Sequence, residues 1–163
     1  MRPRPPQDKI RSLETTLAWR RQLDADGFSL VVTNGCFDLI HRGHVEYLNR
    51  ARTRGDALLV AINSDVSVRA VKGPDRPVVP EVDRAYLLAS LESVDAVYVF
   101  DAPTATDFLG AVKPDVYVKG GDYTRDTIVG EERELLTRMG CRIEFLPHVA
   151  GMSTTELIRR IRG

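Results

Sequence analysis

The sequence contains few of the residues that build disulfides and metal sites. Its 163 residues include two cysteines, Cys36 and Cys141, which lie far apart and show neither CxxC nor metal-ligand spacing. The simplest interpretation is two free thiols in a reducing cytosol. We therefore expect no metal ion held by the protein.

An excess of charge of either sign is also missing. Lys and Arg together number 23, Asp and Glu together number 23, and the formal net charge is zero. A general nucleic-acid binder normally carries a basic excess. We therefore expect no nucleic-acid partner.

Long apolar runs are absent as well. No run approaches the roughly 20 residues of a membrane-spanning helix, and residues 1–6 lack the apolar core of a signal peptide. These absences predict a cytoplasmic protein without a membrane partner. Hydrophobic residues make up 43% and charged residues 28% of the 163 residues, which suits one globular domain with its own core.

Apolar segments that suit buried strands alternate with helical patterns along the chain. We expect strands at 28–33, 57–62, 96–100, 116–119 and 142–146, with helices between them. This alternation predicts an α/β fold with a doubly wound, Rossmann-like parallel sheet of five strands and ligands at their carboxyl ends. Residues 1–27 are expected to form a Pro- and Arg-rich extension and an accessory helix that begins near Ser12, and residues 28–163 the main domain.

One stretch, residues 31–44 (VVTNGCFDLIHRGH), combines a strand, a tight polar loop and a helix start that carries two histidines. A helix N-terminus attracts anions, because its first N–H groups are unpaired and the helix dipole is positive there. Gly35 and Gly43 allow the backbone to approach a phosphate, and His41 and His44 fall on one face of the turn. Such donors stabilise charge on a phosphate under attack without a covalent intermediate.

This stretch resembles the HxGH signature of the cytidylyltransferase-like nucleotidyltransferases, and most of all their heptose 1-phosphate adenylyltransferase branch. Further blocks follow in the family's order: NSD at 63–65, KGP at 72–74, DR at 83–84, KPD at 113–115, KGGDY at 119–123 and STT at 153–155. Together they cover about residues 28–160. One such motif alone would be a weak signal, whereas this ordered series is a strong one.

The resemblance implies a set of site residues. His41, His44 and Lys72 would be catalytic. ATP would be bound by Thr33, Asn34, Gly35, Cys36, Phe37, Gly43, Gly120, Asp122, Ser153 and Thr154. The acceptor would be bound by Asp38, Asn63, Asp65, Arg76 and Lys119.

Several of these residues also have plainer interpretations. Asp38 orients backbone amides as readily as it binds substrate, and Asp65 is equally well a loop cap. Ser153 with Glu156 forms a capping-box pattern that needs no ligand. Arg84 would form a helix-surface ion pair of little worth. Zinc at the histidines is a weaker alternative, because no third ligand stands at suitable spacing.

The implied reaction is transfer of AMP from ATP to a heptose 1-phosphate, with release of pyrophosphate and formation of ADP-heptose for lipopolysaccharide or a related glycan. Mg²⁺ would arrive with the triphosphate, and a separate sugar kinase would supply the acceptor to what is expected to be a homodimer. CTP-using relatives carry an arginine and a threonine shortly before the STT block, where this chain has His148 and Val149, with Met152 just before Ser153, and this departure weakens the case for CTP. The alternatives are a cytidylyltransferase for glycerol 3-phosphate or a similar small phosphate, and a non-catalytic nucleotide-binding regulator.

Overall fold

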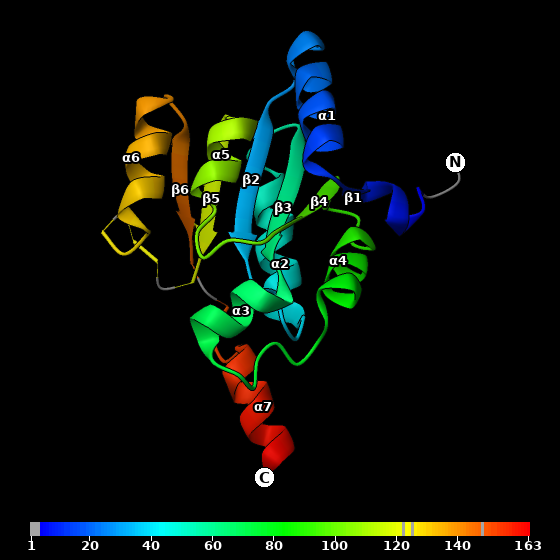
Figure 1. Ribbon diagram of the computed structural model, residues 1–163, viewed down its shortest axis with the longest axis vertical. Helices are drawn as coiled ribbons and strands as arrows, with labels where there is room; N and C mark the ends of the chain where they lie inside the picture. The colour runs from blue at the N-terminus through cyan, green and yellow to red at the C-terminus, as the bar shows by residue number, and fades with distance from the viewer. Residues whose placement is uncertain (1–3, 122, 125, 148) are drawn as a thin grey trace.

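The computed structural model describes residues 4–121, 123–124, 126–147 and 149–163. Its centre is a six-stranded parallel sheet in the order β1-β4-β3-β2-β5-β6 (Figure 1). The strands are β1 (Ile10–Arg11), β2 (Leu30–Gly35), β3 (Ala57–Asn63), β4 (Ala96–Phe100), β5 (Val116–Gly120) and β6 (Arg142–Leu146). The predicted α/β fold with a doubly wound parallel sheet is confirmed, but the predicted number of five strands is too low by one.

The additional strand lies in the N-terminal extension. Ile10 and Arg11 pair with Val97 and Tyr98 of β4, after a 3-10 turn, η1 (Pro6–Lys9). Lys9 Nζ fixes this edge by donating to the carbonyls of Leu91 at 3.0 Å and Val94 at 2.8 Å. A two-residue strand is too short to show the alternating pattern by which strands are recognised.

Helices cover both faces of the sheet. They are α1 (Leu13–Ala25), α2 (Arg42–Arg52), α3 (Asp65–Lys72), α4 (Glu81–Ala89), α5 (Thr106–Val112), α6 (Gly130–Arg138) and α7 (Thr154–Arg162). One core cluster joins alternate residues of β2 and β3 to Leu48 of α2 and Leu88 of α4. The other cluster joins the remaining alternate residues to Leu23 of α1, Leu109 of α5 and Leu136 of α6. The period-2 alternation of the strands therefore builds two cores.

The strand order reverses at β2, which pairs with β3 on one side and with β5 on the other. In open parallel sheets, ligands bind at such a switch point, beyond the carboxyl ends of the strands. The histidine-bearing loop follows β2, and α3 and α7 lie at the same end of the molecule (Figure 1).

The two predicted serine caps are present. Ser12 Oγ accepts from Thr15 N at 3.2 Å at the start of α1, and Ser153 Oγ accepts from Glu156 N at 3.0 Å at the start of α7. The Glu156 carboxylate binds Arg159 and Arg160 instead of completing a capping box. Among the described residues, no helix has the length and apolar character to cross a membrane.

Candidate active site

A cavity of about 620 Å³ opens at the carboxyl ends of the strands. Among the predicted site residues, those that line it are Asn34, Gly35, Cys36, Phe37, Asp38, His41, Gly43, His44, Asn63, Lys72, Arg76, Lys119, Gly120 and Thr154. Three others, Thr33, Asp65 and Ser153, are not part of its lining. Asp122 lies outside the described residues. The switch point thus brings together residues from distant parts of the sequence.

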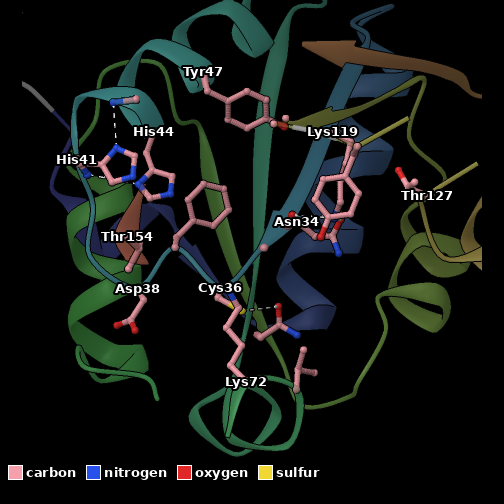
Figure 2. A pocket seen from close by; sticks show the side chains of 18 of the residues that line it. Asn34, Cys36, Asp38, His41, His44, Tyr47, Lys72, Lys119, Thr127 and Thr154 are labelled. Carbon is pink, nitrogen blue, oxygen red and sulfur yellow. Dashed lines mark hydrogen bonds between the residues drawn. The ribbon is translucent and has the colours of Figure 1, made fainter. Parts of the chain in front are cut away.

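The two histidines cap their own helix. His41 is the N-cap of α2, and its Nδ1 accepts from the Gly43 N–H at 3.1 Å. The His41 N–H in turn donates to Nδ1 of His44 at 3.3 Å. The rings stack with their centroids 3.9 Å apart (Figure 2). Because both Nδ1 atoms accept hydrogen bonds, the neutral imidazoles carry their proton on Nε2.

Gly43 leaves room for this arrangement. A Cβ at this position would lie 2.9 Å from atoms of the His41 ring and 3.0 Å from Cβ of Met152. Any larger residue therefore displaces the first imidazole or the segment before α7. The glycine of the HxGH motif is a packing requirement of the histidine pair.

Asp38 ties the histidine loop to the proline-rich segment after α3. Its carboxylate is buried and accepts from Val78 N at 2.9 Å, from Val79 N at 2.8 Å and from Arg76 Nε at 2.6 Å. Burial pulls the pKa of Asp38 upward, but the two amides and the guanidinium outweigh this effect, so its pKa lies below the ordinary value. Asp38 thus organises backbone amides, and because it also lines the cavity, its binding of the acceptor stays a prediction.

Arg84 also joins these loops, from a buried position, and the prediction of a surface ion pair is wrong. Its side chain is fully buried, and its guanidinium donates to the carbonyls of Val79 at 2.9 Å and Cys36 at 2.6 Å and to Asp65 Oδ1 at 2.7 Å. Asp65 therefore binds Arg84 of α4 and does not line the cavity. Arg84 and Asp38 therefore join the same two loops, and both contact Val79.

A partly buried cation lies at the ends of β2 and β5. Lys119 Nζ donates to the backbone oxygen and to Oδ1 of Asn34, at 3.1 and 3.0 Å. Burial lowers the pKa of Lys119, and the nearby Glu132 and Cys36 oppose that shift. In Figure 2, Asn34 and Lys119 stand across the pocket from His41 and His44, and Lys72 reaches in from α3.

Two predicted ATP-binding residues, Thr33 and Gly120, lie against Tyr47, which itself lines the cavity. The Thr33 hydroxyl lies 2.7 Å from the Tyr47 hydroxyl, which also donates to the Val118 carbonyl at 3.0 Å. A Cβ on Gly120 would lie 2.6 Å from the Tyr47 ring. Both residues therefore pack against Tyr47, and their contact with ATP stays a prediction.

Comparison with known proteins bears on what this site does. Residues 32–160 match the family model described as Cytidylyltransferase-like. The chain belongs to the cytidylyltransferase-like family.

Two curated relatives are bifunctional proteins named HldE. The protein from Methylobacillus flagellatus is 48% identical over 158 residues, covering 94% of this chain and 31% of the relative. The protein from Halorhodospira halophila is 50% identical over 147 residues, covering 90% of this chain and 30% of the relative. This chain therefore spans about a third of the length of these relatives.

A solved structure shares the fold. The lipopolysaccharide core biosynthesis protein from Thermoplasma volcanium superposes with a TM-score of 0.60 at 27% identity, covering 76% of this chain and 98% of the other. These matches make this member of the cytidylyltransferase-like family a nucleotidyltransferase enzyme.

Sequence reasoning missed several residues of this nucleotidyltransferase that line the cavity, and among them Glu132 is the charged one. Glu132 of α6 is 2% exposed, and its Oε1 accepts from Ala105 N at 2.8 Å. It stands in the charged run 131–134, which is typical of a solvated helix face. Only its helical spacing from the buried Leu136 would have indicated an inward position.

The histidine, lysine and arginine side chains that line the cavity of this family member are hydrogen-bond donors, which suit anions. Within 4–121, 123–124, 126–147 and 149–163, no group of three or more His, Cys, Asp or Glu is placed to hold a metal ion. Both cysteines are free thiols. Burial raises the pKa of Cys141 to about 11, so this thiol is not an activated nucleophile.

Removing the Asp38 carboxylate charge tests whether this residue holds the histidine loop against the proline-rich segment after α3. In Asp38→Asn, the ion pair to Arg76 and one amide contact are lost, and hydrogen bonds to charged groups are worth about 1.5–3 kcal/mol. We expect trypsin to cleave after Lys72 at least about tenfold faster in the native state, because cleavage follows local opening. Asp75→Asn, on an exposed carboxylate of the same segment, is the control. Equal rates in both variants would contradict this role.

Proposed function

We propose that this chain transfers AMP from ATP to a heptose 1-phosphate, releasing pyrophosphate and forming ADP-heptose. The observation that carries the proposal is the reciprocal capping of His41 and His44 at the start of α2, which puts the proton of each neutral imidazole on Nε2. Their place in the cavity suits a phosphoryl group under attack. Lys72 and the start of α7 add further positive potential around it.

The proposed step is a single displacement. An anomeric phosphate oxygen of the acceptor attacks the α-phosphorus of ATP, and the bond to the bridging oxygen of pyrophosphate breaks, so that pyrophosphate leaves with the electron pair. The attacking phosphate is already anionic, so no general base is needed. Mg²⁺, which prefers phosphate oxygens, is proposed to be carried by the triphosphate. The residues of this chain position the substrates and compensate the charge.

The choice of a heptose rests on the resemblance of the blocks at 119–123 and 149–155 to the heptose branch. The relatives named HldE and the lipopolysaccharide core biosynthesis protein support it. We further propose a cytoplasmic homodimer that receives its acceptor from a separate sugar kinase. The product would serve lipopolysaccharide or a related glycan.

Pyrophosphate release measures the proposed function directly. Purified protein with Mg²⁺ is tested with each of four nucleoside triphosphates against anomeric heptose 1-phosphates and glycerol 3-phosphate. We expect turnover with ATP and one heptose 1-phosphate anomer only. Turnover with CTP and glycerol 3-phosphate would replace this proposal by the cytidylyltransferase alternative. Nucleotide binding without any turnover would favour a regulator.

A further inference from the structure

The cavity has a polar end that the phosphate chemistry does not use. It is formed by Asn34, Lys119 and Glu132, which come from β2, β5 and α6 and all line the cavity. Asn34 and Lys119 face the histidines across the pocket (Figure 2). Phosphoryl groups bound at the histidines would leave this end to an uncharged part of one substrate.

The amide of Asn34 has a fixed orientation. Lys119 is a donor only, so the Asn34 atom 3.0 Å from its Nζ must be the oxygen. The Tyr117 hydroxyl donates to the same oxygen at 2.5 Å. With Oδ1 held by two donors, the Nδ2 group is the remaining polar part of the side chain. It offers two N–H donors at the cavity wall.

Glu132 supplies the complementary acceptor. Its Oε1 holds the backbone N–H of Ala105, at the start of α5, where no side chain of the helix provides a cap. Its Oε2 lies 3.3 Å from the Tyr117 hydroxyl, whose single proton already points to Asn34 at the shorter distance. A carboxylate oxygen that is almost fully buried and lines the cavity thus retains capacity to accept.

Fixed donors beside a buried carboxylate match the hydroxyl groups of a sugar. Each hydroxyl donates one hydrogen bond and accepts others, so one hydroxyl satisfies Glu132 while it accepts from Asn34 or Lys119. A phosphate would be repelled by the carboxylate. The nucleoside has a different wall available, because Pro147 and Val149 line the cavity just before the start of α7.

We propose that Asn34, Lys119 and Glu132 form the subsite for the hydroxyl-bearing ring of the acceptor and determine acceptor specificity. This inference rests on the proposed function and moves Asn34 from the ATP-binding set to the acceptor side. Tyr117 is a positioning residue in this subsite, because it orients the Asn34 amide and contacts Glu132.

Two near-isosteric variants test the subsite. Glu132→Gln keeps an oxygen for the Ala105 N–H and replaces the acceptor at Oε2 by a donor. Asn34→Asp keeps the oxygen for Lys119 and Tyr117 and removes both N–H donors. We expect each variant to raise the KM for heptose 1-phosphate by about tenfold to a hundredfold, the effect of a lost hydrogen bond to a charged group. The Kd for ATP, measured by calorimetry without acceptor, should stay within about twofold.

Controls separate this effect from damage to the fold. Glu134→Gln makes the same change at an exposed position of α6 and should leave both constants unaltered. Ethyl phosphate, which has no ring hydroxyls, should be used equally poorly by wild type and both variants. Thermal unfolding of each variant shows whether the Ala105 contact survives, and Asn34→Asp remains a test if Glu132→Gln does not fold.

Each remaining result overturns a stated part of the inference. A weaker Kd for ATP with unchanged acceptor KM would assign this end of the cavity to the base. No change in either constant would leave Glu132 as a cap for α5 only. Wild-type turnover with glycerol 3-phosphate instead of heptose 1-phosphate would overturn the proposed function. In that case the same variants, assayed with that hydroxylated acceptor, still decide the subsite.

Discussion

Replacing Arg84 by methionine is expected to lower the free energy of unfolding by about 3–5 kcal/mol, the cost of removing one partner of a buried ion pair. The side chain has no exposed surface and donates to two backbone carbonyls and one carboxylate. Methionine fills a similar volume but has no donor, so the carbonyls of Cys36 and Val79 lose their partner. Urea unfolding of wild type and variant measures the difference.

Two further substitutions make the Arg84 test specific. Asp83→Asn changes an exposed charge at the adjacent position and should shift the free energy of unfolding by no more than about 0.5 kcal/mol. Arg84→Lys keeps the charge, but its single ammonium cannot reproduce the planar fork of three contacts. It should recover less than half of the loss. A loss below about 1 kcal/mol in Arg84→Met would show that other contacts hold the two loops together.

The parts of the fold that sequence predicted correctly depend on near neighbours. The helix caps at Ser12 and Ser153 act within three residues of themselves. The stacked histidines are three residues apart, and their first turn is built from their own backbone. The five longer strands are recognisable because each contains at least three apolar residues. Local patterns of this kind are readable from the chain alone.

The parts that sequence missed depend on contacts between distant segments. The contacts of Arg84 reach Asp65, 19 residues away, and Cys36, 48 residues away. Glu132 holds Ala105, 27 residues away. In each case a charged residue in a polar context suggests a solvated surface, and only the tertiary structure supplies the partner. The resemblance placed Arg84 in a family block but did not assign it a partner.

The largest effect on catalysis is expected from His44. Its ring has two functions that different substitutions separate, because Nδ1 caps the His41 N–H and Nε2 carries the proposed donor. In His44→Asn, the amide oxygen takes the place of Nδ1 and the Nε2 donor is lost. In His44→Gln, the amide N–H lies near the position of Nε2 and the cap is lost. Each variant therefore retains one function of the His44 ring and loses the other.

We expect His44→Asn to lower kcat by about 10²–10³-fold, the effect of removing one donor to a developing oxyanion, while the Kd for ATP changes by less than about threefold. His44→Gln should retain more turnover and lose about 1 kcal/mol of stability, a typical cost of a lost N-cap. Pyrophosphate release, calorimetry with ATP and urea unfolding measure the three quantities. Equal losses of kcat and ATP affinity in His44→Asn would assign the imidazole to ground-state binding. Full turnover in His44→Asn would reduce the histidine to a cap, because a donor that acts only in the transition state must affect the rate when it is removed.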